Sequence, residues 1–363
     1  MIVKEGARLN QLDKAREKIN AIDVQMRELF EQRMKAVEEV AEYKLKNNMK
    51  IFDPDREAEV IEKNSIKMQN EKLKLYYREY IQAVMDISKS YQESIVNCDT
   101  YGYQGVLGAF SHIATQRLFP HGKMKNYAAF EGAVKGVLNH EIAKAVLPFE
   151  NSYTGEVGEI LDLLFKYDVV IQSIYDLKIN QNLLGLKGAT LCDIKQVYSK
   201  DQAINQCQDF LKNFDYELIP YANTALAAKF VSESQDKSKA AIASIETAEL
   251  YGLEVLAENI NTSKDNTTRF VVVGNELPED GNHLSIVFTV HHESGQLAKI
   301  MQIVAKYGFN MENIKSRSLK DASWQYYFYM EIEGHYRDEK MQSMLEECRN
   351  SSSNFKVIGV YNH

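Results

Sequence analysis

The sequence predicts a multidomain protein in which a three-helix, all-α segment precedes a two-lobed α/β domain and a ferredoxin-like α+β domain. Three observations carry this prediction. Helical periodicity dominates the N-terminal part, short strand-like runs alternate with helix-length segments after Asn97, and a β-α-β-β-α-β order begins near residue 283. We expect the three domains at residues 7–97, 100–275 and 283–363.

The composition excludes several classes of protein. Of the 363 residues, 45% are hydrophobic, which is ample for packed cores, and the formal net charge is −8. A negative balance argues against a nucleic acid or an anionic membrane as a partner of the whole molecule. No run of about 18 apolar residues occurs, and the N-terminus lacks an apolar signal segment, so we expect a cytoplasmic protein without membrane spans.

Neither disulfides nor a metal site are expected. The cysteines are scattered without the CxxC spacing of zinc and redox motifs, so we expect reduced, buried thiols at Cys98, Cys192, Cys207 and Cys348. The nearest approach to a metal cluster is His291-His292-Glu293. Adjacent residues of a strand point to opposite faces, so we expect no metal there.

The first predicted element is a long amphipathic helix. Spacings of three and four residues mark one seam through Leu9, Leu12, Arg16, Ile19, Asp23, Met26, Phe30, Arg33, Val37, Val40 and Lys44. Three of these positions are cations, and burying an unpaired cation is costly, so the seam predicts a small polyanion inside a helical bundle. A coiled coil with snorkelling or inter-chain-paired cations is the alternative.

The spacing of the three cations bears on oligomeric state. Arg33 and Lys44 are roughly 16 Å apart along a helix that rises about 1.5 Å per residue, and two long side chains converge across that gap. Arg16 and Arg33 are roughly 25 Å apart, which is too far for convergence. If Arg16 serves the same kind of site, it reaches into the site of a second chain, and an intertwined homodimer follows.

Two further helices bring more polar residues to the bundle. Asp53-Pro54 is a helix start signal, an N-cap carboxylate followed by proline, and it places Arg56 and Glu57 in the first turn. A third helix is expected over residues 73–95, where Ser88 lies on the seam and Gln92 follows one turn later.

Residues 7–97 resemble the three-helix chorismate mutase on these positions. The resemblance implies eight substrate contacts: Arg16 from the partner chain, Arg33 and Arg56 on the carboxylate and hydroxyl side, Lys44 and Gln92 on the ether oxygen, and Asp53, Glu57 and Ser88 on the ring hydroxyl and carboxylate. The implied reaction, chorismate to prephenate, is a pericyclic shift that needs no nucleophile, proton transfer or cofactor, so fixed cations and an amide suffice. Because Gln92 stands where a glutamate would need a proton, we expect activity near neutral pH.

The segment after Asn97 reads as an α/β domain. Strand-like runs occur at residues 104–107, 143–148, 169–174, 196–198, 216–219, 240–243 and 269–273, separated by helix-length segments. The long middle excursion suggests two lobes with a cleft between them. Ligands of such folds sit at the carboxyl ends of strands, beside helix N-termini.

Five polar motifs fall at those strand ends. They are Gly105 and Gly108 before Ser111 and His112, residues 148–152, residues 198–202 leading to Gln206, residues 223–225, and residues 266–270. Each alone is an ordinary helix cap or turn, but five together favour a binding pocket.

Together these motifs resemble prephenate dehydratase over residues 100–275, most specifically at residues 148–152 and 266–270. The resemblance implies that Thr268 assists departure of the ring hydroxyl. It also implies further site residues: Asn151, Gln206 and Glu150 lining the site, Arg269 on a substrate carboxylate, and Ser111, His112, Ser152 and Thr224 as additional contacts. Glu150 is a candidate proton source, although the sequence does not assign the acid.

The sequence departs from that family at three places. Lys200-Asp201 stands where the motif usually reads His-Pro, Ala109 replaces a serine, and Gln181 occupies the place of a usual histidine.

The last domain follows the ferredoxin-like order. The expected elements are residues 284–291, 296–307, 310–318, 323–333, 338–350 and 354–361. With Gly295-Gln296-Leu297 and residues 315–318 (Lys-Ser-Arg-Ser), the segment resembles the amino-acid-sensing ACT domain, whose strings usually read Gly-Ala-Leu and Glu-Ser-Arg-Pro. The resemblance implies a phenylalanine effector site at Gly295, Leu297, Ser316 and Arg317.

The whole chain thus resembles bifunctional chorismate mutase/prephenate dehydratases, with chorismate and prephenate as substrates, phenylalanine as effector and no cofactor. A mutase fused to prephenate dehydrogenase would need a GxGxxG dinucleotide loop, which the sequence lacks. An amino-acid-sensing binding protein without chemistry would have no need for Lys44, Arg56, Gln92 and Thr268. An arogenate-preferring dehydratase stays open, because that preference depends on the detailed shape of the pocket.

Overall fold

The computed structural model describes residues 11–47, 54–96, 99–263, 265–318 and 326–362, with the backbone alone at Leu45, residues 54–58 and residues 93–96. The chain divides into two compact units, Met1–Cys98 and Asp99–His363, and each is described by itself.

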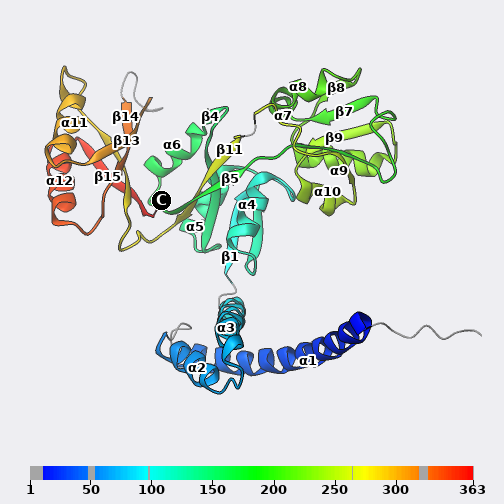
Figure 1. Ribbon diagram of the computed structural model, residues 1–363. Helices are drawn as coiled ribbons and strands as arrows, with labels where there is room; N and C mark the ends of the chain where they lie inside the picture. Colours follow the sequence, from blue (N-terminus) through cyan, green and yellow to red (C-terminus); the bar gives the residue numbers. More distant parts are fainter. Residues whose placement is uncertain (1–10, 48–53, 97–98, 264, 319–325, 363) are drawn as a thin grey trace, which may run out of the picture. The chain divides into compact units, whose positions relative to one another are not determined.

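The first unit is helical, as the sequence predicts. It contains α1 (Gln11–Lys46), α2 (Pro54–Ile66), a 3₁₀ turn η1 (Glu71–Leu73) and α3 (Lys74–Val96) (Figure 1). Asp13 lies in the first turn of α1 and Lys44 and Lys46 in its last turn, where each charge complements the helix dipole. The start of α2 at Pro54 agrees with the predicted start signal, although Asp53 itself lies outside the described residues.

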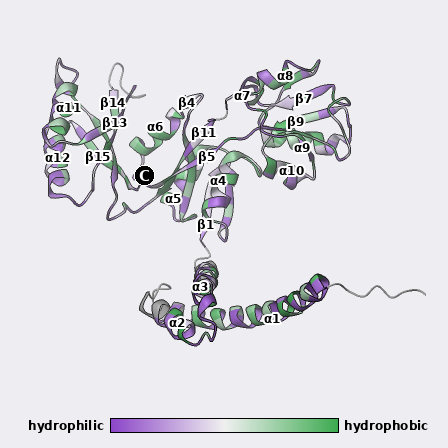
Figure 2. Ribbon diagram, viewed as in Figure 1, coloured by the Kyte–Doolittle hydropathy of each residue, from purple (hydrophilic) through white to green (hydrophobic). Residues whose placement is uncertain are grey.

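The two halves of α1 differ in how they are covered. Val37 and Ala41 in the C-terminal half are buried. The N-terminal half carries apolar positions along its length (Figure 2), yet Ile19, Met26 and Leu29 are 57%, 43% and 62% exposed. Among the described residues of one chain, no side chains cover this apolar stretch of α1 fully.

The first lobe of the second unit is built on a mixed sheet. Its strands are β1 (Thr100–Gln104), β2 (Lys123–Tyr127), β3 (Lys144–Asn151), β5 (Val170–Lys178) and β11 (Thr267–Gly274), in the order β5-β11-β3-β1-β2, with β4 (Gly155–Glu156) beside β3. The helices are α4 (Phe110–Leu118), α5 (Phe130–Leu138) and α6 (Gly158–Lys166). The strands β1, β2 and β3 run parallel, whereas β11 pairs antiparallel with both β3 and β5.

Period-two alternation explains how this sheet is covered on both faces. Val271 and Val273 join a core with α5 and α6, whereas Phe270 and Val272 join a second core with Ile113 of α4. Because β11 is buried on both faces of the sheet, the centre of its sequence is a continuous apolar run.

The second lobe is a separate five-stranded sheet. Its order is β10-β6-β9-β7-β8, formed by β6 (Asn182–Gly185), β7 (Gln196–Ser199), β8 (Glu217–Pro220), β9 (Lys239–Ala243) and β10 (Glu254–Ala257). The helices are α7 (Asp201–Gln206), α8 (Gln208–Leu211), α9 (Thr224–Ser234) and α10 (Ile245–Tyr251). One core forms with Ile204 and Leu211, and another with Ala228 and Val231, so helices cover both faces.

The C-terminal segment follows the predicted β-α-β-β-α-β order. Its elements are β12 (His283–Thr289), α11 (Gln296–Lys306), β13 (Asn310–Ser318), β14 (Tyr326–Glu333), α12 (Glu339–Asn350) and β15 (Asn354–Tyr361), with strand order β13-β14-β12-β15. This is the ferredoxin-like arrangement. Strand β15 also pairs in parallel with β5 through Gly359 and Ile171. In the part of the chain that the structure describes, the ferredoxin-like sheet therefore continues into the first-lobe sheet.

Several predicted strand positions need correction. The first strand was expected at residues 104–107, but β1 ends at Gln104, and Gly105 and Gly108 adopt φ values of +110° and +83°. Such left-handed backbone suits a glycine loop rather than a strand. Strands β2, β6 and β10 were missed. The sequence of β2, Lys-Met-Lys-Asn-Tyr, is largely exposed and carries little apolar signal.

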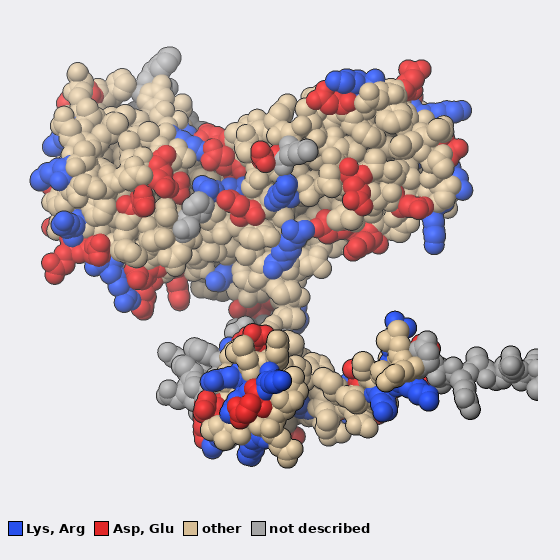
Figure 3. Space-filling view, in the orientation of Figure 1, with Lys and Arg blue, Asp and Glu red and all other residues tan. Residues whose placement is uncertain are grey.

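Two surface properties agree with the composition. Acidic and basic side chains are interspersed over the visible face of the Asp99–His363 unit (Figure 3). Among the described residues, the helices are all too short or too polar to traverse a lipid bilayer.

Candidate functional site

The helical unit gathers polar side chains between α1 and α3. The Arg33 guanidinium donates to the Ser88 hydroxyl and, at 3.5 Å, to the Val84 carbonyl oxygen. Ser88 and Gln92 are buried, at 4% and 8% exposure. A second side-chain contact joins α1 and α3 beside the Arg33–Ser88 hydrogen bond: the Tyr91 hydroxyl donates to the Glu38 carboxylate.

These groups are incompletely satisfied within one chain. Burial lowers the pKa of the Arg33 guanidinium from its ordinary value, and the nearby Tyr80 opposes that shift. The Gln92 Oε1 atom is buried and has no hydrogen-bond partner among the described residues. A desolvated cation and an unpaired buried acceptor suit a polar ligand that carries both an anionic group and a hydroxyl group.

The other predicted contacts of this site lie elsewhere along α1 or outside the described side chains. Lys44 is half-buried near the end of α1. Arg16 is exposed near the start of α1, where its Nη1 lies 3.7 Å from Asp13 on the same helix. Asp53 lies outside the described residues, as do the side chains of Arg56 and Glu57.

In the second unit, a cavity of about 410 Å³ opens between the two lobes. Four of the predicted site residues line this cavity: Asn151 and Thr268 from the first lobe, and Gln206 and Thr224 from the second lobe. Ser111, at the start of α4, also lines it. The sequence motifs at the strand ends therefore do converge on one cavity.

Asn151 organises the first-lobe wall. Its amide Nδ2 donates to Thr268 Oγ1 at 2.9 Å and to Asn266 Oδ1 at 2.8 Å. Its Oδ1 accepts from the backbone N–H groups of Tyr153 and Thr154, both at 3.0 Å. The side chain is 8% exposed. Because Thr268 Oγ1 accepts from Asn151, the threonine keeps its own hydrogen for another acceptor.

The second lobe supplies the facing wall. Lys200, Gln202 and Gln206 come from the start and end of α7, and Gln202 Nε2 reaches across to donate to Thr154 Oγ1 at 3.3 Å. Asn223 caps α9 by accepting from Leu226 N–H at 2.8 Å, which places Thr224 at the first helical position.

Two cavity-lining amides carry unpaired atoms. Gln181 Oε1 and Asn266 Nδ2 are buried without a hydrogen-bond partner among the described residues. Both side chains are almost fully buried. One offers an acceptor and the other a donor, which suits a ligand that carries both hydroxyl and carboxylate groups.

Two further predicted contacts, His112 and Ser152, lie next to residues that line the cavity but do not line it themselves. His112 Nδ1 accepts from Gly108 N–H at 3.4 Å and the ring packs edge-on to Tyr103, while burial lowers the pKa of the imidazole. The Ser152 hydroxyl accepts from Thr267 N–H at 3.0 Å and donates to the Asp265 carbonyl at 3.1 Å, which fixes the start of β11.

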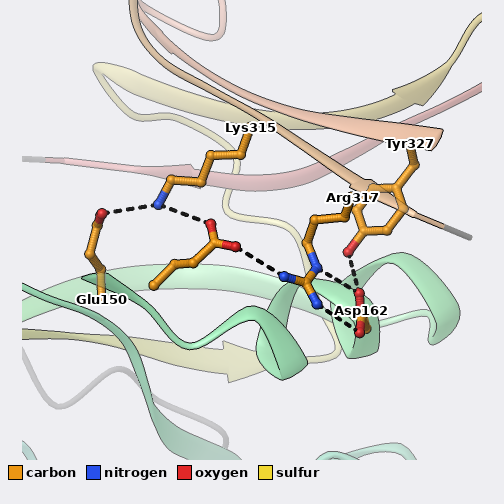
Figure 4. Close-up of polar contacts among 6 residues, drawn as sticks. Glu150, Asp162, Lys315, Arg317 and Tyr327 are labelled. Atoms are coloured by element: carbon orange, nitrogen blue, oxygen red, sulfur yellow. Dashed lines mark hydrogen bonds and ion pairs between the residues drawn. The ribbon is translucent and has the colours of Figure 1, made fainter. Parts of the chain in front are cut away.

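The structure corrects the placement of Glu150 and Arg269. Neither residue borders the cavity. Glu150 is next in sequence to Asn151, and Arg269 is next to Thr268. Because successive residues of a strand point to opposite faces, each side chain points away from the cavity that its neighbour lines. Arg269 Nε donates to Asp176 Oδ1 at 3.1 Å on β5. Glu150 Oε1 accepts from Lys315 Nζ at 3.1 Å (Figure 4). Both side chains are thus engaged by other residues of the chain.

Lys315 belongs to a polar network that joins β13 to the first lobe. Arg317 donates through Nε and Nη2 to both Asp162 carboxylate oxygens, at 2.8 and 3.1 Å, and through Nη1 to Glu156 at 3.0 Å. The buried Tyr327 hydroxyl donates to Asp162 Oδ1 at 2.7 Å (Figure 4). Arg317 was expected at an effector, and the structure instead engages it with the first lobe.

A second cavity, of about 310 Å³, lies in the ferredoxin-like domain. Leu297 lines it with Val290 and Phe328, and Glu293 lies at its wall. Gly295 precedes α11 with φ of +85°, and Ser316 is the register partner of Phe328. Three of the four predicted effector residues thus lie in or next to this cavity wall.

Several cavity residues were not among the predicted site residues, and Thr154 and Asn266 are two of them. Asn266 belongs to the polar run before β11, so its signal was present in the motif. Thr154 lies in the turn between β3 and β4 and became recognisable only through its contacts with Asn151 and Gln202.

Comparisons with known proteins agree with this two-unit organisation. A family model described as prephenate dehydratase matches residues 101–278, and one described as chorismate mutase type II matches residues 15–93. A bifunctional chorismate mutase/prephenate dehydratase of Neisseria gonorrhoeae is 31% identical over 355 residues, which cover 95% of each chain.

Two further comparisons cover the second unit. The arogenate dehydratase/prephenate dehydratase 1 of Arabidopsis thaliana is 34% identical over 277 residues, or 71% of each chain. A crystal structure of a prephenate dehydratase from Arthrobacter aurescens in complex with L-Phe superposes with a TM-score of 0.67 at 27% identity, covering 73% of this chain and 90% of that one.

Proposed function

We propose residue roles for this chain, which belongs to the family of bifunctional chorismate mutase/prephenate dehydratases. The enzyme rearranges chorismate to prephenate and then converts prephenate to phenylpyruvate, carbon dioxide and water, in the synthesis of phenylalanine. The observation that carries the assignment of the second site is the Asn151–Thr268 hydrogen bond at the wall of the interlobe cavity.

The mutase reaction takes place beside Arg33, Ser88 and Gln92. Chorismate is a dianion, and its rearrangement breaks an ether bond while a carbon–carbon bond forms, without proton transfer. Arg33 binds a carboxylate, and Lys44 and Gln92 donate to the ether oxygen as negative charge develops there. The desolvated Arg33 guanidinium supports the carboxylate contact, and the buried position of Gln92 beside Ser88 on α3 supports its place in the site.

The mutase site is completed by a second copy of the chain. Arg16 is exposed in one chain, and the apolar residues of the same half of α1 are exposed with it. An antiparallel or crossed partner helix would bury Ile19, Met26 and Leu29 and carry Arg16 to the partner's Arg33 region. We therefore propose a homodimer with shared mutase sites.

The dehydratase reaction takes place beside Thr268. As the ring carboxylate leaves as carbon dioxide, its bonding electrons enter the ring, and the ring hydroxyl departs from the opposite carbon with its own bonding electrons, as hydroxide. A proton from the solvent converts this hydroxide to water. Asn151 donates to Thr268 Oγ1, so the threonine hydrogen is directed toward the leaving hydroxyl. Because no aspartate or glutamate lines the cavity within the described ranges, this hydrogen bond rather than a carboxylic acid assists the departure.

Feedback by phenylalanine acts through the ferredoxin-like domain, which we propose to be an ACT domain. The cavity beside Leu297 offers an apolar wall for the phenyl ring and Glu293 for the ammonium. The Lys315–Glu150 ion pair connects this domain to the residue next to Asn151. A shift of β13 on effector binding would thereby reach the wall of the dehydratase cavity.

One assay tests the whole assignment. Purified protein supplied with chorismate, and with no cofactor, should produce phenylpyruvate, which is followed by its ultraviolet absorbance in alkali. Accumulation of prephenate without phenylpyruvate would contradict the dehydratase assignment, and unchanged chorismate would contradict the mutase assignment.

A further inference from the structure

The interlobe cavity is electrically asymmetric. Among its described lining residues, Lys200 alone carries a charge, and the others are apolar, hydroxyl or amide side chains. Within the described chain, the Lys200 ammonium forms no ion pair with a carboxylate. Its neighbours Gln202 and Gln206 are neutral and face the same space. The cavity thus has a neutral lining except for one charged residue, the solvent-exposed Lys200, on its second-lobe side.

The reaction restricts what that charge can hold. The proposed substrate carries its leaving hydroxyl at one end of the ring and two substituents at the other, a carboxylate and a side chain that ends in a second carboxylate. A cation on the departing ring carboxylate would stabilise a charge that is lost in the transition state and would slow the reaction. The side-chain carboxylate keeps its charge throughout, so it is the group that Lys200 can hold without that penalty.

The two candidate substrates differ at this same side chain. Prephenate carries an uncharged keto group beside the side-chain carboxylate, whereas arogenate carries an ammonium there. An ammonium beside Lys200 is a like-charge contact, and the described lining offers no carboxylate to offset it. The uncharged amides of Gln181 and Gln206 also leave the lysine charge unopposed.

We propose that Lys200 binds the side-chain carboxylate of prephenate and is the residue that makes this cavity select prephenate over arogenate. The proposal rests on the dehydratase function proposed above, and it adds the determinant of substrate choice. The position of Lys200 near the contact between the two lobes supports the proposal. Gln202, two residues after Lys200, donates to Thr154, which is hydrogen-bonded to Asn151 of the first lobe.

The test compares two substitutions with both substrates. Lys200→Gln removes the charge at similar length, and Lys200→Arg keeps it. We expect Lys200→Gln to lower kcat/KM for prephenate on the order of tenfold to a hundredfold, mainly through KM, as loss of a charge-assisted hydrogen bond would. The value for arogenate should change less than threefold, and Lys200→Arg should keep the preference for prephenate.

Lys212→Gln is the matched control. Lys212 lies in the same lobe, is exposed, and pairs with Asp209 instead of facing the cavity. Mutase turnover of every variant gives the amount of chain in the assay, and arogenate turnover reports whether the dehydratase lobes are folded. An unchanged kcat/KM for prephenate in Lys200→Gln, or equal losses with both substrates, would overturn the role of Lys200. Failure of the dehydratase function is a separate result, because the unsubstituted protein would then convert neither substrate.

Discussion

Lys315 Nζ lies 3.1 Å from Glu150 Oε1 and 3.6 Å from Glu156 Oε2 (Figure 4). Glu150 immediately precedes Asn151, whose amide holds Thr268. The ammonium of a strand in the ferredoxin-like domain therefore lies against the end of β3, the strand that carries Asn151. Lys315 is also a position where the sequence departs from the usual ACT string, which has a glutamate there.

The first prediction concerns coupling through this ion pair. Lys315→Met leaves Glu150 and Glu156 without that cation, so the phenylalanine concentration for half-inhibition should rise about fivefold or more, within the usual range of coupling energies. Dehydratase activity without phenylalanine should stay within about twofold of the unsubstituted enzyme. Lys306→Met is the control, because it breaks a comparable pair with Glu347 inside the ferredoxin-like domain. An unchanged phenylalanine response in Lys315→Met would show that this pair carries no coupling.

The second prediction concerns Thr268. Removing the hydroxyl in Thr268→Ala should lower dehydratase kcat by about a hundredfold, since one hydrogen-bond donor on a developing charge is worth roughly 3 kcal/mol. Thr268→Ser keeps the donor and should retain measurable turnover. Chorismate consumption should persist in both, so Thr268→Ala should accumulate prephenate. Equal losses in the two variants would indicate that Thr268 packs rather than reacts.

The third prediction concerns the shared mutase site. Arg16→Ala and Lys44→Ala should each lower mutase turnover by about a hundredfold or more. If each site takes Arg16 from one chain and Lys44 from the other, mixing the two inactive proteins under exchange conditions should restore about a quarter of the activity. Dehydratase activity serves as the internal control for both chains. A mixture that stays inactive despite exchanged subunits would exclude the shared site.

The fourth prediction concerns Gly295. Its φ of +85° is a left-handed conformation, and among the described residues other than its chain neighbours, no atom lies within 4 Å of where a Cβ would be. A substitution is thus strained by the backbone rather than by crowding. Gly295→Leu should distort the start of α11 beside the Leu297 cavity and weaken phenylalanine binding, measured by calorimetry, while activity without effector is kept. Gly295→Asn, which tolerates this conformation better, should bind more tightly than the leucine variant.

The fifth prediction concerns acid sensitivity of the first lobe. Burial lowers the pKa of His112 below its ordinary 6.5, and its Nδ1 accepts from Gly108 N–H, so the folded state favours the neutral ring. The stability from the neutral ring is therefore complete above pH 6.5 and is lost as pH falls from 6.5 through the folded pKa. His112→Gln should show a smaller fall in Tm between pH 7.5 and pH 5.5 than the unsubstituted protein. An identical fall would mean that His112 does not contribute to it.

The sequence was informative wherever periodicity and local chemistry decide the structure. Pro54 marks the observed start of α2, and the polar residues at strand ends, Asn151, Gln206, Thr224 and Thr268, meet at one cavity. Both results follow from local rules, namely helix start signals and the position of ligands at strand ends.

The misplaced residues depended on information beyond the local sequence. Glu150 and Arg269 were assigned from a motif, but the alternation of β3 and β11 turns them from the cavity toward Lys315 and Asp176. Lys315 lies 165 residues after Glu150 along the chain. No local pattern predicts such a pairing, because it depends on the docking of one domain against another.

The position of β11 has a consequence for how the protein is made. This strand, which carries Thr268, lies between β3 and β5, yet residues 179–266 of the second lobe come between β5 and β11 in the chain. During synthesis, β3 and β5 therefore emerge with facing edges unpaired until the whole second lobe has been translated. The last strand, β15, then adds to the remaining edge of β5. The first-lobe sheet of the nascent chain is therefore incomplete until β11 has been translated. During this interval, the unpaired strand edges make the first lobe most prone to aggregation.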